Sequence, residues 1–391
     1  MDLAQIEGYA KDGSAPHQIY LSRLYMMGAG VSRDVNRAME WLNTAVKQGD
    51  AAAFTERAVV RAQGYAGAID RADAWQDMLE AAERGDVGAT RQLGAITHMI
   101  GDTDSALGLL QAAAKAGDAP SKILLADLLR EAGDPDAAYW YHACKGNALA
   151  DWRIETHGYS QPPALAAPER NVPSDILDML DGFDPFDAEP IVPQRRHSNP
   201  QIFVKAKAIP STLCQYVMAA GSALIRESEV VDPDTGKSKI DPYRTGFLSQ
   251  FVPGVCDFTV AVFDYRIALH SDTAPQQGEP LTMIVYKPGQ QYKPHWDFLV
   301  DTMDESFGRL GRSGNRERTA LVILDEGFTG GATRFTRLDL DIRLQRGDML
   351  VFQNIDENGN RHDDSMHAGL PVEAGMKWLA SKWIRERAYA H

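Results

Sequence analysis

The chain has 391 residues, of which 44% are hydrophobic, 24% charged and 8% aromatic. It is too long for one compact core and too apolar for a disordered protein, so two or three domains are expected. A formal net charge of −14 argues against a general nucleic-acid-binding protein, whose affinity depends on neutralising phosphates.

The cysteines indicate the redox environment of the protein. Cys144, Cys214 and Cys256 lie far apart and form no CxxC pair, which excludes a disulfide framework and a thiolate zinc site and is typical of a reducing compartment. The first residues lack the basic and apolar regions of a signal peptide, and no apolar run approaches the roughly 20 residues that span a bilayer. We therefore expect a cytoplasmic protein that does not associate with membranes.

The first 150 residues are rich in alanine and nearly free of proline, which favours short helices. A Gly-Asp turn recurs between helical stretches, at Gly49-Asp50, Gly85-Asp86 and Gly117-Asp118. Glycine can end one helix, and aspartate can cap the next. The glycines at 13, 49, 85 and 117 are 36, 36 and 32 residues apart, a spacing typical of paired-helix repeats.

Aligning these turns brings similar residues into register: Leu21, Leu93 and Leu125; Leu24, Ile96 and Leu128; Ala38, Ala74 and Ala106; Trp41 and Leu109. The second copy departs from the pattern, with Arg57 where leucine is expected. Leu24-Tyr25-Met26-Met27-Gly28 resembles the Leu-Tyr-x-x-Gly element of Sel-like repeats, a tetratricopeptide-related family. This resemblance covers about residues 5–150 and implies a helical solenoid, whose concave surface either binds a partner protein or only supports the neighbouring domain.

Prolines interrupt the chain between residues 151 and 200, which we interpret as a Pro-rich linker with one short helix over 174–180, capped by Ser174. Beyond it, Ser211 can cap a helix that runs to about Glu227. Several β-rich runs then predict an antiparallel sandwich or barrel: Thr259–Tyr265, Leu281–Tyr286, Ala320–Leu324, Asp348–Phe352 and Trp378–Ile384. The predicted domains are residues 1–150 and 201–391, on either side of this linker.

His295-Trp296-Asp297 has two ligand-type side chains at positions i and i+2, which point to the same face of a strand. His270-Ser271-Asp272 and His362-Asp363-Asp364 have the same spacing, but their neighbours predict loops. His295 instead lies between a strand-like run and an apolar run, and His367 is a plausible third ligand. Two imidazoles and one carboxylate suit the facial site of a non-haem Fe(II) oxygenase better than a tetrahedral zinc site.

The residues from His367 to Trp378, with Trp383 beyond them, resemble the prolyl 4-hydroxylase branch of the 2-oxoglutarate-dependent Fe(II) dioxygenases. Further elements similar to family motifs occur in the family's order: Arg244-Thr245-Gly246, Tyr286-Lys287-Pro288-Gly289-Gln290-Gln291-Tyr292, Phe328-Thr329-Gly330-Gly331-Ala332-Thr333-Arg334-Phe335 and Arg346-Gly347-Asp348-Met349-Leu350-Val351-Phe352. The resemblance spans about residues 200–387. It implies a double-stranded β-helix, a jelly-roll sandwich that follows the helical repeats in a multidomain α + β chain.

The same resemblance implies that His295, Asp297 and His367 are the iron ligands. Lys377, ten residues after His367 as in this family, would then pair with the distal carboxylate of 2-oxoglutarate. An independent argument favours a cation at that place, because burying a dianionic cosubstrate in an apolar barrel without a counter-charge costs too much free energy. Lys382 faces the other way on the same strand, so we expect it to be solvated.

Five further side chains are candidates for the site. Tyr286 and Tyr292 either line the cosubstrate pocket through their hydroxyls or are buried core tyrosines. Thr319 or Thr333 can add a hydroxyl. By analogy with the family, Arg244 orients the substrate, and its alternative is a structural ion pair.

The resemblance implies oxidative chemistry, in which 2-oxoglutarate is converted to succinate and CO2 while a C–H bond is hydroxylated, with ascorbate as a further cofactor. A protein or peptide substrate, hydroxylated on proline, is favoured, although a free amino acid, another side chain or a small metabolite stays open. The polar segments 230–243 and 301–318 are either lids that clamp a peptide or solvated loops.

Two other interpretations compete with the dioxygenase. The chain can be a non-catalytic scaffold that binds proteins through its helical repeats, in which case the metal ligands are dispensable. It can also be a metal enzyme of the cupin type that does not use 2-oxoglutarate, in which case Lys377 is dispensable.

Overall fold

The computed structural model describes residues 2–159, 168–228, 230–231, 238–239, 243–300 and 310–389. The chain forms two compact units, one of Met1–Asp187 with Val252–Val262 and the other of Ala188–Phe251 with Phe263–His391. The sequence predicts a linker over 151–200, whereas the first unit extends to Asp187. The extension packs on the helices, where the Trp75 indole N–H donates to the carbonyl of Leu180 at 3.0 Å. In the described part of the chain, no helix is both long and apolar enough to cross a membrane.

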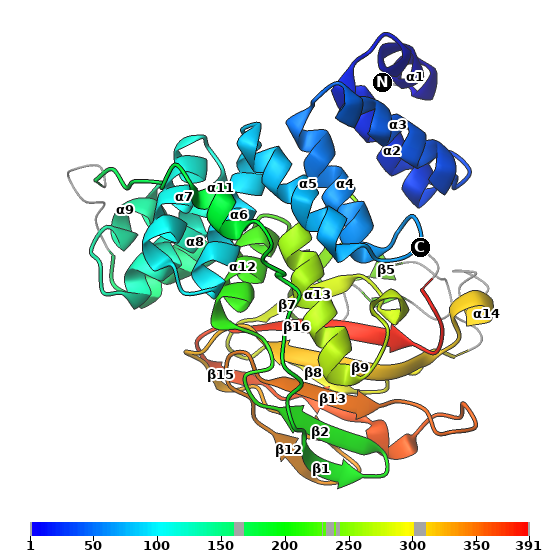
Figure 1. Cartoon of the computed structure of the whole chain (residues 1–391). Coiled ribbons are helices and arrows are strands. Elements are labelled where there is room, and N and C mark those ends of the chain that lie inside the picture. The colour runs from blue at the N-terminus through cyan, green and yellow to red at the C-terminus, as the bar shows by residue number, and fades with distance from the viewer. Residues whose placement is uncertain are drawn as a thin grey trace. The chain divides into compact units, whose positions relative to one another are not determined.

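The first unit is helical, and its consecutive helices pack side by side (Figure 1). Every helix from α2 to α8 has 13 residues. The helices are α1 (Leu3–Lys11), α2 (Ala15–Met27), α3 (Val35–Lys47), α4 (Ala51–Gln63), α5 (Arg71–Glu83), α6 (Val87–Met99), α7 (Thr103–Lys115), α8 (Ala119–Glu131), α9 (Ala137–His142), α10 (Ala148–Thr156) and α11 (Ile176–Leu180).

The Gly-Asp turns have the predicted geometry. Asp50, Asp86 and Asp118 each accept a hydrogen bond from the backbone N–H three residues later, at 2.9, 2.6 and 2.8 Å, and so cap α4, α6 and α8. The glycine before each aspartate has a positive φ, which closes the preceding helix. The repeat predicted from these turns is confirmed at this level.

Six residues at the aligned apolar positions lie in the core of the helical unit and are inaccessible to solvent, namely Leu21, Leu93, Leu125, Ala38, Ala74 and Ala106. Leu24 and Trp41 are partly buried. The second copy differs at two positions that contact each other. The Arg57 guanidinium donates to both carboxylate oxygens of Asp77, at 2.9 and 2.6 Å. Asp77 stands three residues after Ala74, where the other copies have Trp41 and Leu109. A charged pair therefore replaces an apolar one in this copy.

The segment Val252–Val262 is counted with the helical unit, where Asp257 pairs with Arg91 at 3.1 Å and Phe258 stacks on Trp75. The predicted strand over Thr259–Tyr265 is wrong, because these residues lie in α13 (Phe258–Ser271). The Asp257 carboxylate accepts from the N–H of Val260 at 3.0 Å, as a capping residue does. Tertiary packing and this cap outweigh the β-propensity of Thr, Val, Phe and Tyr, which is only a weak preference.

The structure also differs from the predicted start and end of the other helices. α12 (Ser211–Ser222) ends before the predicted Glu227, which lies in a short strand. Neither Ser211 nor Ser174 caps a helix: the residue before α12 is Pro210, and the one before α11 is Asp175, without a side-chain cap. A further helix is α14 (Leu310–Ser313), and 3-10 turns occur at Pro275–Gln277 and Asp363–Ser365.

The second unit is built on two main antiparallel sheets. The larger has the strand order β1-β2-β13-β9-β16-β7-β6-β3 and the smaller has the order β12-β11-β14-β8. The strands are β1 (Gln194–Ser198), β2 (Gln201–Lys205), β3 (Arg226–Glu227), β4 (Val230–Val231), β5 (Ser238–Lys239), β6 (Phe247–Phe251), β7 (Leu281–Tyr286), β8 (Tyr292–His295), β9 (Arg316–Ile323), β10 (Thr329–Gly330), β11 (Thr333–Phe335), β12 (Leu340–Ile342), β13 (Met349–Gln353), β14 (His367–Gly369), β15 (Val372–Ala374) and β16 (Lys377–Arg385). The four other predicted strands correspond to β7, β9, β13 and β16.

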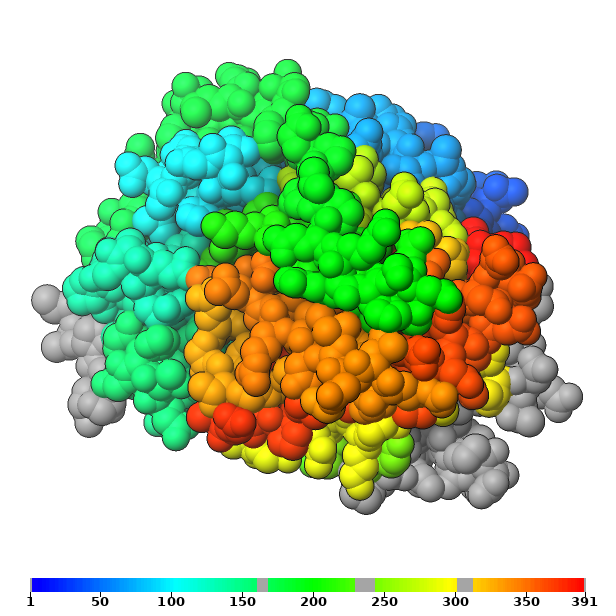
Figure 2. Space-filling view, turned by 90° about the horizontal axis from the view of Figure 1, so that it is seen from below, coloured from blue at the N-terminus to red at the C-terminus, as the bar shows by residue number. Residues whose placement is uncertain are grey.

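Apolar side chains from both sheets meet between them, as in a jelly roll. One cluster joins Val204 of β2 and Phe352 of β13 to Phe335 of β11 and Ile342 of β12. The outer strand β1 stays on the surface, and the green residues of β1 and β2 are visible there beside the orange residues of the smaller sheet (Figure 2). The predicted fold, helical repeats followed by a sheet-rich oxygenase domain, is thus observed.

Candidate active site

His295, Asp297 and His367 converge in the second unit, where their ligand atoms all lie within 4.8 Å of one another. Nε2 of His295 is 3.9 Å from Oδ1 of Asp297, and Nε2 of His367 is 3.7 Å from Oδ2. His295 ends β8 and His367 begins β14, and the two residues are paired across these strands. All three predicted ligands are therefore brought together, and they form the one such group among the described residues.

Both imidazoles have one nitrogen, Nε2, with a free lone pair that can bind a metal. Nδ1 of His295 is 2.8 Å from the carbonyl of Lys293, and Nδ1 of His367 is 3.0 Å from the carbonyl of Ser365. A carbonyl can only accept, so Nδ1 bears the proton and Nε2 keeps its lone pair. Burial and the neighbouring His367 lower the pKa of His295 to about 3, so its ring is neutral at physiological pH.

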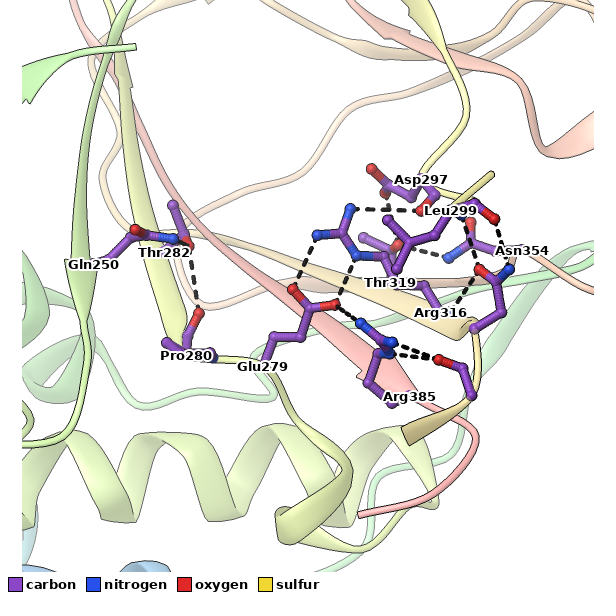
Figure 3. A network of polar contacts seen from close by, with 12 residues as sticks. Gln250, Glu279, Pro280, Thr282, Asp297, Leu299, Arg316, Thr319, Asn354 and Arg385 are labelled. Atoms are coloured by element: carbon purple, nitrogen blue, oxygen red, sulfur yellow. Dashed lines mark hydrogen bonds and ion pairs between the residues drawn. The ribbon is translucent and has the colours of Figure 1, made fainter. Parts of the chain in front are cut away.

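Asp297 does not lie on a strand, contrary to the i, i+2 argument, because β8 ends at His295. Side chains near β9 hold this part of the chain instead (Figure 3). The Thr319 hydroxyl donates to Oδ2 of Asp297 at 2.7 Å, and Nη1 of Arg316 is 3.5 Å from the Asp297 carbonyl. Burial alone would raise the pKa of Asp297, but His367, His295 and Arg316 hold it below its ordinary value, so the carboxylate is charged.

The backbone beyond Asp297 is tied by one amide side chain. Oδ1 of Asn315 accepts from the N–H of Leu299 at 2.9 Å, and its Nδ2 donates to the carbonyl of Leu299 at 2.8 Å. Asn315 thus imitates the two hydrogen bonds of a paired strand residue. This clamp fixes the chain where regular pairing has stopped.

A register shift explains how Tyr292 reaches the site. His367 pairs with His295, but Gly369 pairs with Tyr292, so β8 has one extra residue in this interval. The bulge places Tyr292 and His295 on one face although they are three residues apart. Their rings stack, and the ring centres are 3.5 Å apart. Tyr292 therefore lines the site.

The metal-ligand group opens into a cavity of about 450 Å³. Alternate residues of β16 line it, as the predicted period of two requires: Lys377, Leu379, Ser381 and Trp383. Lys377 is 4% exposed, and its ammonium donates to the carbonyl of Gly331 at 2.6 Å. Burial lowers the pKa of Lys377 to about 8. The cavity therefore has a cation in the same enclosure as the three ligands.

The Gly330-Gly331 pair is explained by this cavity. Gly331 has a φ of 62°, and a Cβ there would lie 3.1 Å from Cδ of Lys377. A Cβ on Gly330 would lie 2.6 Å from the carbonyl oxygen of Pro371, which is closer than real contacts. Glycine at both positions lets the backbone approach Lys377 and offer it a carbonyl.

The prediction for Lys382 is wrong. This residue faces away from the cavity as expected but is 5% exposed, and its ammonium pairs with Asp264 of α13 at 2.8 Å. Helix α13 covers that face of the sheet, whereas the sequence pattern predicts a strand for these residues and leaves the face open to solvent. His270 is likewise buried in the last turn of α13, not in a loop.

The remaining candidate residues fall into two groups. Tyr286, Tyr292, Thr333 and Arg244 line the cavity, whereas Thr319 lies behind Asp297 and contacts its carboxylate. Burial raises the pKa of Tyr286, and it raises that of Tyr292 to about 12, so both keep their hydroxyl protons.

Arg244 makes no ion pair among the described residues. Its guanidinium lies 5.0 Å from the Tyr292 ring centre, and its Nε and Nη2 are buried without a hydrogen-bond partner in the described structure. The alternative of a structural ion pair is therefore not observed there. The predicted lid segment 230–243 lies mostly outside the described residues. Of the segment 301–318, residues 310–318 are described, and they contain α14 and the first residues of β9 instead of a loop throughout.

Sequence reasoning missed a buried charge network behind the site (Figure 3). Glu279 accepts from Arg316 at 2.8 and 2.9 Å and from Arg385 at 3.0 Å. The Arg316 guanidinium lies 3.9 Å from the ring centre of Trp383, which lines the cavity. These residues are up to 106 positions apart in the chain, and no local pattern signals their contact.

The donor set fits ferrous iron. Two neutral imidazoles and one carboxylate on one side of an ion are the facial arrangement of non-haem Fe(II) oxygenases, and they leave the opposite positions free. Their closeness to a buried, unneutralised ammonium fits a cosubstrate with a carboxylate at its far end.

Comparison with known proteins agrees with this geometry. The family model described as 2OG-Fe(II) oxygenase superfamily matches residues 281–385, and the Sel1 repeat model matches residues 18–50 and 92–118, leaving out the second copy. Prolyl 4-hydroxylase 1 of Arabidopsis thaliana is 30% identical over 205 residues, which cover 49% of this chain and 70% of that protein. The chain belongs to the prolyl 4-hydroxylase family.

A second relative is similar to the same part of the chain. This putative prolyl 4-hydroxylase of Acanthamoeba polyphaga mimivirus is 31% identical over 189 residues, covering 48% of this chain and 75% of that protein.

Two solved structures are similar to different parts of the chain. A viral collagen prolyl hydroxylase from Paramecium Bursaria Chlorella virus-1 covers 47% of this chain and 95% of its own, with 23% identity and a TM-score of 0.36. A Sel1 repeat protein from Oxalobacter formigenes covers 39% of this chain and 66% of its own, with 26% identity and a TM-score of 0.35.

As a prolyl 4-hydroxylase family member, the chain is a 2-oxoglutarate-dependent dioxygenase that uses Fe(II). The complete ligand set and the cation in the same cavity agree with this assignment. Both competing interpretations, a scaffold without catalysis and a metal enzyme without 2-oxoglutarate, lose their support.

Proposed function

We propose that the protein uses O2 to hydroxylate proline residues of a protein or peptide: one oxygen atom enters a proline C–H bond, and the other enters the succinate that forms as 2-oxoglutarate loses CO2. The observation that supports this most is the shared cavity, which has the His295, Asp297 and His367 group and the Lys377 ammonium in one enclosure. The names of the relatives supply the choice of proline.

In this proposal His295, Asp297 and His367 hold the iron, through one nitrogen of each imidazole and one carboxylate. Bound Fe(II) would activate O2, the oxidant, with 2-oxoglutarate as the co-reductant, which is chemistry that the protein side chains cannot supply. The chain's own task is to orient these groups and to exclude water from the cavity.

Lys377 binds the distal carboxylate of 2-oxoglutarate, because a buried ammonium to which the described residues offer only a carbonyl has two further N–H donors for an anion. The hydroxyls of Tyr286, Tyr292 and Thr333 line the same cavity and can donate to cosubstrate oxygens. Both tyrosines remain protonated at neutral pH, as their raised pKa values require.

Arg244 orients the substrate. A guanidinium has no acceptor capacity, so Nε and Nη2 of Arg244, which are buried and have no hydrogen-bond partner among the described residues, call for a carbonyl or carboxylate oxygen. A peptide backbone supplies carbonyl oxygens next to the target residue. Trp383, which also lines the cavity, offers an apolar surface for a proline ring.

Three parts of the proposal concern the surroundings of the reaction. Ascorbate serves as the reductant that keeps the iron ferrous. The Sel1 repeats bind a partner or substrate protein, because stacked repeats form extended binding surfaces. A cytoplasmic location is supported by the three cysteines, which are all free thiols.

The test uses the purified full chain with Fe(II), 2-oxoglutarate and ascorbate, with and without proline-rich peptides. We expect succinate to form in proportion to a mass increase of about 16 Da on proline, because each turnover transfers one oxygen atom. The His367→Ala variant serves as the control and should form neither product. Oxidation at another residue would contradict the choice of proline, and absence of succinate under all conditions would contradict the dioxygenase.

A further inference from the structure

Asp297 is the metal ligand whose position the fold explains least, because it follows the end of β8 and pairs with no strand of the described residues. Its carboxylate is 5% exposed and is held by Thr319 of β9, whose hydroxyl is 2.7 Å from Oδ2. Thr319 in turn lies 2.9 Å from Nδ2 of Asn354, the residue after β13. Thr319 and Asn354 are completely buried (Figure 3).

The direction of both hydrogen bonds follows from the chemistry of the groups. A charged carboxylate can only accept, so the single hydroxyl proton of Thr319 must point to Asp297. The Thr319 oxygen is then free to accept, and the NH2 group of Asn354 supplies the donor. The hydrogen bonds from Asn354 to Thr319 and from Thr319 to Asp297 therefore run in one direction. They keep the Thr319 O–H pointing at the carboxylate.

From this chain we propose that Thr319, held by Asn354, is a positioning residue for the iron ligand Asp297, and this inference rests on the proposed function. The Thr319 hydroxyl takes one lone pair of Oδ2, which favours metal binding through Oδ1. A carboxylate that binds through one oxygen takes one coordination position, and with the two imidazoles it leaves three positions of an octahedral ion free. A carboxylate free to bind through both oxygens would obstruct one of them.

The large sheet contains a second buried threonine that serves as a matched control. Thr282 of β7 is a buried threonine of the same large sheet, and its hydroxyl donates to the carbonyl of Pro280 at 3.3 Å, not to a ligand (Figure 3). Replacing Thr282 by valine removes a buried hydroxyl of similar setting without touching Asp297. An effect that Thr319→Val shows and Thr282→Val does not is therefore due to the carboxylate.

The test measures metal binding by the full-length apo chain, with Co²⁺ as the probe and its visible absorption as the signal. We expect Thr319→Val to raise the dissociation constant for Co²⁺ by about 10–100-fold, the usual loss when a partner of a metal ligand is removed. The absorption band should shift as well, because Oδ2 becomes available to the ion. Thr319→Ser, which keeps the hydroxyl, and Thr282→Val should bind within about threefold of the unmodified chain.

Two results separate this inference from the proposed function. A Thr319→Val chain that is folded and binds Co²⁺ with unchanged affinity and spectrum would overturn the inference. Failure of the unmodified chain to bind Co²⁺ would overturn the proposed iron site itself. If Thr319→Val does not fold, Asn354→Leu decides, because loss of the donor to Thr319 should weaken Co²⁺ binding by a factor smaller than about 10-fold but more than Thr282→Val does.

Discussion

Buried cations have different surroundings in the helical unit and in the cavity of the sheet unit. In the helical unit, Arg57 is bonded to both oxygens of Asp77, and Arg153 contacts Asp127 at 2.9 Å. In the cavity, the described residues offer Lys377 only a backbone carbonyl. A buried charge that finds its counter-charge within the chain serves the structure, whereas one without it indicates a place for an anionic ligand.

Strand β16 shows the same contrast over a short distance. Lys377 and Lys382 are both buried lysines of this strand, yet they point to opposite faces. Lys382 has its carboxylate partner in Asp264, and Lys377 has none among the described residues. Substituting each lysine in turn tests whether this difference separates function from stability.

The largest effect is expected from Lys377→Met. Loss of a buried partner of a charged group costs about 2–5 kcal/mol, so the KM for 2-oxoglutarate should rise roughly 30- to 4000-fold. Lys382→Met is the control and should lower the free energy of unfolding while the KM stays near its original value. Steady-state kinetics with varied 2-oxoglutarate measures the first, and urea unfolding the second. An unchanged KM in Lys377→Met would show that Lys377 does not bind the cosubstrate.

In the helical unit, Asp77→Ala should lower the free energy of unfolding by about 2–4 kcal/mol, because it removes the carboxylate that pairs with the largely buried Arg57 and with Arg61. Replacing Arg57 and Asp77 together by leucine should recover this loss, since leucine occupies the same positions in the copy with Leu93 and Leu109. Urea unfolding of the full chain measures both variants. A double variant no more stable than Asp77→Ala would show that this pair does more than substitute for an apolar contact.

The affinity for 2-oxoglutarate should depend on pH, because the Lys377 ammonium has no carboxylate partner among the described residues. Burial lowers the pKa of Lys377 to about 8, so the ammonium is present below this pH and is lost above it. The affinity for 2-oxoglutarate should therefore fall as the pH rises beyond about 8, toward tenfold for each unit. Tyr286 and Tyr292 have raised pKa values and stay neutral in this window. Titration calorimetry at several pH values measures this, and Lys377→Arg, which stays charged, should remove the dependence.

The smallest effect is expected from Gly331→Ala, whose Cβ would press on the Lys377 side chain from 3.1 Å. With the strain of a positive φ, a cost of about 1–2 kcal/mol corresponds to a KM for 2-oxoglutarate raised roughly 5- to 30-fold. Gly327→Ala is the control, because Gly327 also has a positive φ, but a Cβ there would meet no atom of the described residues within 4 Å. Equal effects of the two substitutions on KM would attribute the change to backbone strain alone.

The sequence was informative where a local pattern determines the structure. The Gly-Asp turns identify the helical repeats, and the period of two on β16 correctly orients Lys377 toward the cavity. It failed where distant contacts decide, as for α13, whose run of β-branched and aromatic residues folds as a helix. The expected solvation of Lys382 failed for the same reason, because Asp264 lies 118 residues away and its helix was not anticipated.

The attachment of Asp297 has a consequence for how the enzyme fails on heating. Arg316 holds the Asp297 carbonyl and Asn315 holds the backbone of Leu299 two residues later, and both lie at the start of β9, where strand ends fray first. Fraying there loosens the backbone around Asp297, although Thr319, which is paired inside the sheet, still contacts the carboxylate. Catalysis should therefore be lost at a lower temperature than the sheet melts, and cooling should restore it as long as the iron has not been oxidised or lost to solution.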